Sequence, residues 1–129
     1  MKKELSKEEI IEQYIKSGEI MTKERLEGKY RRYNREVNKN IKLTEYLSHH
    51  LETAKEMFPI LLEEKNEYTR YLASINCFQL GIYIEKAEKN LKEISKKSKE
   101  SITRFDAEMA LRRWKNRDKN YIIYHTEEQ

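Results

Sequence analysis

Two short segments of the sequence interleave positively charged and aromatic side chains. The first is Lys29–Arg35 and the second is Arg112–Arg117. Arginine and lysine neutralise phosphate groups, arginine with planar two-pronged hydrogen bonds, and tyrosine or tryptophan rings stack on bases. This pattern predicts a face that binds nucleic acid or a similarly charged partner. The residues expected to contribute are Lys29, Arg31, Arg32, Arg35, Arg112, Arg113, Trp114, Lys115 and Arg117.

A second interpretation fits the same residues. Tyr30 and Tyr33 fall on the apolar register of the helix expected there, so they are also candidates for the core, with the arginines around them on the solvated side of that helix. Trp114 is likewise a candidate core residue. The two basic segments support a shared binding face only if folding brings them to one side of the molecule.

The residues that most often bind metals give no recognisable site. His49 and His50 are adjacent and so point to different sides of a helix, while Glu45 and Glu52 flank His49 on one face. This trio lacks the ligand spacing of di-iron bundles and of zinc proteases. Cys77 is the only cysteine, so the chain has no internal disulfide, and its apolar surroundings predict a buried residue. We therefore expect no metal and no cofactor.

Catalytic motifs are also missing. The sequence has no glycine-rich phosphate loop, and no serine or cysteine nucleophile has a recognisable base beside it. Acid–base catalysis needs groups with shifted pKa values in a dry pocket, and a thin helical bundle offers few such pockets. We expect a protein that is not an enzyme and has no small-molecule substrate.

Composition favours one all-α domain over residues 1–129. Hydrophobic residues make up 37% of the chain and charged residues 39%, and the chain holds only three glycines and one proline, which sheets and tight turns consume. The charged N-terminus does not resemble a signal peptide, and no apolar run approaches the roughly 20 residues of a membrane span. We expect a cytoplasmic protein without a membrane segment, frayed at residues 1–5 and 126–129.

Capping residues and apolar spacing predict the helices of the N-terminal half. Ser6 and Glu9 have capping-box spacing, and Gly18 suits a helix end, which predicts a short helix over residues 7–17. From Thr22 onward the sequence predicts either one helix to residue 58 or two helices broken near 38–40, and we favour the single helix. Its apolar positions are Leu26, Tyr30, Tyr33, Val37, Ile41, Leu47, Leu51, Ala54 and Phe58.

The C-terminal half begins with the only proline and contains the clearest pattern. Pro59 is expected to end or kink the preceding helix. A heptad seam after it predicts a central helix over residues 60–94. Gly81, in the middle of this helix, is expected to let a neighbouring helix approach closely. Residues 95–101 read as a loop, followed by a final helix to about residue 119 and an extended segment at 121–124. The seam consists of Ala73, Cys77, Leu80, Ile84, Ala87, Leu91 and Ile94.

These elements predict an elongated helical bundle with coiled-coil-like packing. Its centre is a long helical hairpin, residues 22–58 against 60–94, with a short N-terminal helix and a C-terminal helix in the groove of the hairpin. The wide apolar arc of the central helix also suggests that two copies associate as a homodimer.

Charge is segregated along the chain. Residues 22–42 hold eight basic and three acidic side chains, residues 43–68 hold two and six, and residues 91–120 hold ten and five. The first functional hypothesis is a regulatory or accessory protein that contacts nucleic acid, or a nucleic-acid-bound machine, through the basic segments. The alternative is a protein-only interaction module, such as an inhibitor, an antitoxin-like or immunity protein, or a phage or plasmid accessory protein, that acts by covering a partner.

Overall fold

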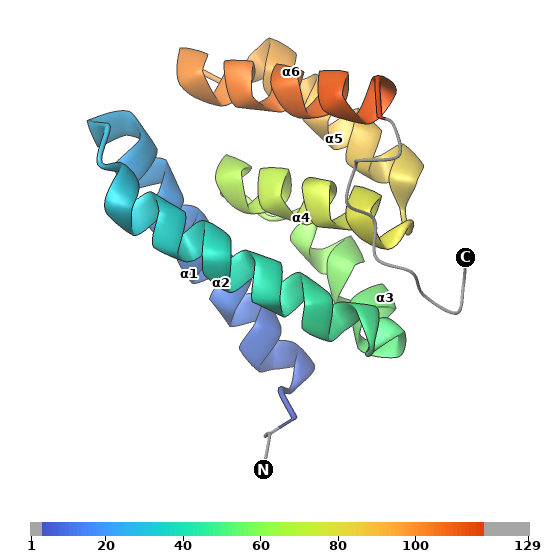
Figure 1. Cartoon of the computed structure of the whole chain (residues 1–129). Helices are drawn as coiled ribbons and strands as arrows, with labels where there is room; N and C mark the ends of the chain where they lie inside the picture. The colour runs from blue at the N-terminus through green and yellow to red at the C-terminus, as the bar shows by residue number, and fades with distance from the viewer. Residues whose placement is uncertain (1–3, 118–129) are drawn as a thin grey trace.

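The computed structural model describes residues 4–117, and all regular structure in that range is helical (Figure 1). The all-α class predicted from the sequence is confirmed, as a globular bundle without strands in the described residues. The helices are α1 (Lys7–Glu27), α2 (Tyr30–Ser48), α3 (Leu51–Leu61), α4 (Glu67–Leu80), α5 (Ile84–Lys97) and α6 (Ser101–Lys115).

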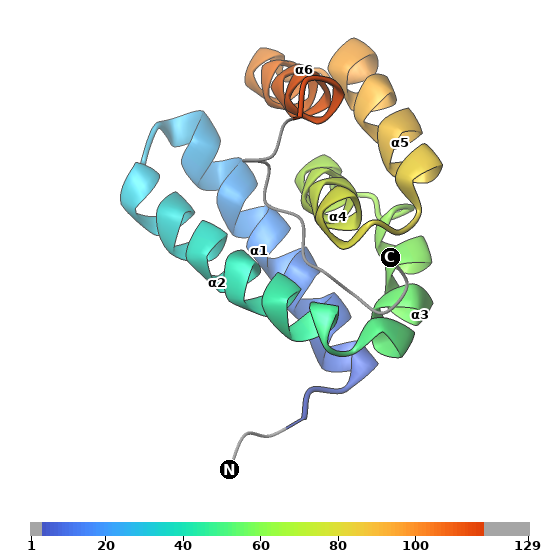
Figure 2. The ribbon, with the colours of Figure 1, turned by 45° about the vertical axis from the view of Figure 1, so that its right-hand side comes forward.

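Helix α4 lies at the centre of the bundle. The antiparallel pair α1 and α2 packs on one side of it and the pair α5 and α6 on the other, while α3 lies at one end against α1, α2 and α4 (Figures 1 and 2). Ten of the 14 residues of α4 are buried, because neighbours surround it on several sides. The expectation of a central helix in this part of the sequence is confirmed for α4.

Helix α1 is much longer than the predicted helix over residues 7–17. It begins as expected, with the reciprocal capping box of Ser6 and Glu9, but it continues through Gly18 to Glu27. Gly18 is buried against α4, where a Cβ atom would overlap Oγ1 of Thr69 and lie 2.9 Å from its backbone nitrogen. This glycine therefore permits close helix packing, and the helix ends instead at Gly28, whose φ of 70° L-residues rarely adopt.

The predicted single helix over residues 22–58 is wrong, and so is the alternative break near 38–40. The chain turns at Gly28 and again at His49 and His50, which separate α2 from α3. Asn40 does not interrupt α2, because its side chain exchanges two hydrogen bonds of 3.0 Å with the amide of Asn76 on α4. This half-buried amide pair holds α2 against the central helix.

Part of the apolar seam predicted for residues 22–58 lies at the surface. Leu26, Tyr30 and Ile41 are about half exposed, at 50%, 49% and 50%, although their spacing predicted core positions. The turn at Gly28 breaks the helical register on which that prediction depended. Helix α2 buries Leu47, as predicted, together with Glu36, Leu43 and Thr44, which were not among the predicted positions.

The predicted helix over residues 60–94 is also divided. Gly81 adopts a φ of 71° and caps α4, so it ends a helix. Pro59 lies in the last turn of α3 and has no N–H to donate to the carbonyl of Lys55, which accepts a hydrogen bond of 2.7 Å from the hydroxyl of Tyr83. The heptad residues are nevertheless buried or half-buried on both sides of the break.

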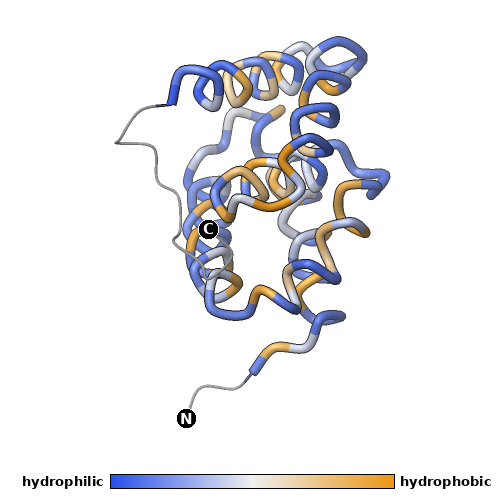
Figure 3. Tube along the Cα trace, turned by 90° about the vertical axis from the view of Figure 1, so that its right-hand side faces the viewer, coloured by the Kyte–Doolittle hydropathy of each residue, from blue (hydrophilic) through white to orange (hydrophobic). Residues whose placement is uncertain are grey.

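The connection between α5 and α6 is shorter than the sequence predicted. Helix α5 runs to Lys97 and α6 starts at Ser101, so the loop expected at 95–101 contains three residues. Helix α6 ends at Lys115, before the end expected near residue 119. The segment expected at 121–124 and the fraying expected at 126–129 lie outside the described residues. Hydrophilic positions interrupt the hydrophobic ones along every helix (Figure 3), and no helix among residues 4–117 is long and apolar enough to cross a bilayer.

The contact of Gly18 with Thr69 predicts the effect of one substitution. In an exposed helix, changing glycine to alanine stabilises by about 1 kcal/mol, but Gly18→Ala should instead destabilise by about 1–2 kcal/mol because α1 and α4 must separate. Chemical denaturation measures the difference. Gly28→Asn is the matched control, because no atom lies near its Cβ position and asparagine tolerates its φ. Equal or greater stability of Gly18→Ala would contradict this packing.

Candidate functional site

A buried carboxylate on α6 is joined to the end of α1. Asp106 is 8% exposed, and Arg25 in the last turn of α1 donates hydrogen bonds of 2.8 and 3.0 Å from Nη2 and Nε to its two oxygens. The hydrogen bonds to Asp106 raise the pKa of Arg25 above its ordinary value, so the guanidinium remains charged. This two-pronged ion pair crosses from the first helix of the chain to the last.

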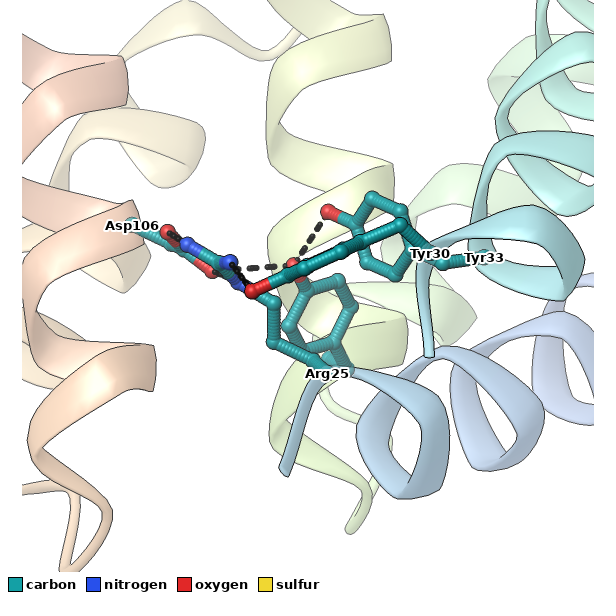
Figure 4. Close-up of polar contacts among 5 residues, drawn as sticks. Arg25, Tyr30, Tyr33 and Asp106 are labelled. Carbon is teal, nitrogen blue, oxygen red and sulfur yellow. Dashed lines mark hydrogen bonds and ion pairs between the residues drawn. The ribbon is translucent and has the colours of Figure 1, made fainter. Parts of the chain in front are cut away.

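Two tyrosines extend this pair through the bundle (Figure 4). The hydroxyl of Tyr68 on α4 donates a 3.0 Å hydrogen bond to Asp106, so its oxygen accepts the 2.6 Å hydrogen bond from Tyr33 on α2. Burial raises the pKa of both phenols, which keeps them protonated and able to donate. We call Arg25, Asp106, Tyr68 and Tyr33 the central network, which contains one residue from each of α1, α2, α4 and α6.

Two further aromatic rings lie beside the central network. The half-exposed ring of Tyr30 has its centre 5.8 Å from the guanidinium carbon of Arg25, and its hydroxyl accepts a long 3.4 Å hydrogen bond from Nη1 (Figure 4). The ring of Tyr71 is 4.9 Å from that of Tyr68 and is buried. The network is therefore enclosed by Tyr71 on α4 and partly open to solvent beside Tyr30.

The central network connects the helices that carry the two basic segments. Burial raises the pKa of Tyr33 and Tyr71, and the positive charge of Arg113 acts in the opposite direction on both phenols. Arg113 is exposed and lies seven residues after Asp106, which places it on the same side of α6. The hydrogen bonds from Tyr33 to Tyr68 and from Tyr68 to Asp106 therefore connect this side of α6 to a residue of the first basic segment.

The other predicted arginines and lysines differ in their neighbours. Four of these cations are exposed and form no ion pair with any residue from 4 to 117. They are Arg31, Arg35, Arg113 and Lys115. The remaining cations have acidic neighbours on the surface. Their ion pairs are Lys29 with Glu27 at 3.2 Å, Arg32 with Glu24 at 3.7 Å and Arg112 with Glu108 at 3.1 Å.

Trp114 lies in the core. Its ring stacks on Phe78 of α4, with 4.4 Å between the ring centres, and its Nε1 donates a 3.1 Å hydrogen bond to Glu88 of α5. The guanidinium of Arg117 lies 3.7 Å from the ring centre. Phe78 and Arg117 thus already occupy the ring, which agrees with the core interpretation of this residue and leaves no open surface for a base.

An open groove of about 570 Å³ lies between α1 and α2. Its buried carboxylate, Glu36, accepts a 2.8 Å hydrogen bond from Ser17 and pairs with Lys39 at 3.1 Å, so its charge is already compensated. Burial raises the pKa of Cys77 and disfavours a reactive thiolate. No group of three potential metal-binding side chains occurs among the residues that the structure describes.

Sequence reasoning missed three members of the central network. Arg25, Tyr68 and Asp106 lie outside the two basic segments, and apolar spacing predicts Tyr33 and Tyr68 only as core residues. The available signal was the position of Asp106. It falls in the stripe of small residues that α6 buries, where a carboxylate needs a partner.

A scan against protein-family models, a search of curated proteins and a search of solved structures each found no match to this chain. The geometry of the site therefore supplies the whole argument about function.

The ion pair of Arg25 with Asp106 should contribute substantially to stability. Asp106→Ala leaves the guanidinium and the Tyr68 hydroxyl without their acceptor, and we expect a loss of about 3 kcal/mol in the free energy of unfolding. Glu108→Ala is the matched control, because it removes an exposed ion pair from the same helix and should cost less than about 0.5 kcal/mol. Urea titrations of both variants measure the difference, and equal losses would show that the buried pair has no special role.

Proposed function

We propose that this chain is a cytoplasmic, non-enzymatic regulatory or accessory protein that contacts nucleic acid or a nucleic-acid-bound machine. The proposed contact face comprises the start of α2 and the C-terminal part of α6. The observation that carries the proposal is the central network, which links Tyr33 of the first basic segment through Tyr68 to Asp106 of α6, the helix that carries the second basic segment. Arg31, Arg35 and Arg113 form no ion pair with any residue between 4 and 117, so their charges are available to phosphate.

The position of the acidic residues supports the same face. Glu52 and Glu56 are exposed on α3, which follows the C-terminal end of α2, whereas Arg31 and Arg35 lie at its start (Figure 1). A helix of 19 residues such as α2 is roughly 28 Å long, which exceeds the screening length of about 8 Å at physiological salt. The carboxylates of α3 therefore weaken the attraction of phosphate to this basic end very little.

The alternative, a protein-only interaction module that covers its partner, is favoured by a different observation. Leu26 and Tyr30 are half exposed on the two sides of the turn between α1 and α2. Exposed apolar side chains at a protruding corner are typical of protein interfaces. In this case the basic side chains around the corner would select an acidic protein surface.

The nucleic-acid proposal is tested by reversing the three unpaired charges. The triple variant Arg31→Glu, Arg35→Glu and Arg113→Glu should bind single- and double-stranded oligonucleotides about 100-fold more weakly at low salt, as measured by fluorescence anisotropy. The matched control makes the same change in net charge on α5, where Lys92, Lys96 and Lys97 are exposed, and should lose much less affinity. An equal loss in both variants, or negligible binding by the wild-type protein at low salt, would contradict the proposal.

A further inference from the structure

A second cavity of about 380 Å³ opens between α4, α5 and the connection from α3 to α4. It is not lined by any residue of the central network. Its charged lining consists of three cations and two carboxylates, contributed by Arg70 of α4, Lys86, Lys89 and Glu93 of α5, and Glu63 of the connection. Its volume is within the range of small-molecule sites, and its lining carries a net positive charge.

Arg70 is held in place by neutral acceptors. Its Nε donates a 3.1 Å hydrogen bond to the side chain of Asn90, and its Nη1 donates one of 2.9 Å to the backbone carbonyl of Glu64. Asn90 is itself fixed by a 2.7 Å hydrogen bond to the carbonyl of Leu62. The half-buried guanidinium is thus rigidly oriented, yet no carboxylate among residues 4–117 forms an ion pair with it.

The two lysines add charge at the same wall. Lys86 and Lys89 are three residues apart, so they lie on one face of α5, and neither forms an ion pair with a described residue. Glu93 is one turn further along that face, and Glu63 lies across from it on the connection between α3 and α4. Neither carboxylate pairs with the three cations, although all five line one cavity, so both kinds of charge remain available to a ligand.

We propose that this cavity binds a phosphate monoester whose remaining part carries hydroxyl or amino groups. A phosphate monoester has a charge between about −1.5 and −2 at neutral pH, and Arg70, Lys86 and Lys89 supply three compensating charges. Nη2 of the pre-oriented guanidinium donates no hydrogen bond to the described residues, so it is available to a phosphate oxygen. Glu63 and Glu93 accept hydrogen bonds from the hydroxyl or amino groups. This site requires no bond to be made or broken, and it is independent of the proposed nucleic-acid face.

Isothermal titration calorimetry with three probes tests this site. Glycerol 3-phosphate should bind with a Kd of about 1 mM or below, inorganic phosphate should bind several-fold more weakly, and glycerol should not bind. The variant with Lys86→Gln and Lys89→Gln should bind glycerol 3-phosphate at least about 10-fold more weakly, since each lost charge contact with phosphate is worth more than a neutral hydrogen bond. The variant with Lys92→Gln and Lys96→Gln loses the same charge outside the cavity and should retain the wild-type Kd.

Three results would overturn the proposal. The first is the absence of heat with glycerol 3-phosphate, and the second is an equal loss of affinity in the two lysine variants, which would indicate unspecific attraction by net charge. The third is tighter binding of inorganic phosphate than of glycerol 3-phosphate, which would leave Glu63 and Glu93 without a role. All four lysines are on α5, where Lys86, Lys89, Lys92 and Lys96 are exposed, so both variants are expected to fold.

Discussion

The buried charge of Asp106 constrains how the two sides of the bundle fit together. A carboxylate inside a protein is costly unless a cation and hydrogen-bond donors surround it, and here Arg25 and Tyr68 fill these roles from α1 and α4. Helix α6 otherwise packs on α5 and α4 through Trp114 and its small residues. The central network therefore links α6 to the pair of α1 and α2, and it determines where Arg113 lies relative to α2.

The class of the fold and much of its core follow from local patterns, but the helix boundaries do not. The capping box at Ser6 was correctly identified because its signal lies within four residues. The two glycines were assigned each other's roles: Gly18 admits α4 at close range, and Gly81 ends a helix. A glycine satisfies both needs through its missing side chain, and only the position of the packing partner distinguishes them. For Gly18 that partner is Thr69, which is 51 positions away in the sequence.

For the candidate interface too, some features are predictable from the sequence and others are not. Exposed arginines such as Arg31 and Arg35 are recognisable from composition, because a run of positive charge is almost always solvated. Their relation to Arg113 depends on the central network, whose members come from four different helices. Asp106 gave a local hint, since it interrupts a stripe of small buried residues, but the sequence does not state which of the many arginines is its partner. The pairing of residues that are far apart in the sequence could be identified only from the structure.

The central claim is that the network positions the two basic segments as one face for nucleic acid. Oligonucleotide affinity of folded Asp106→Asn, compared with wild type at the same low salt, tests this claim most directly. Removing a negative charge should by itself strengthen binding to a polyanion, whereas a face that depends on the network should bind more weakly. We predict weaker binding; unchanged or stronger binding would show that the basic segments act through their charge alone.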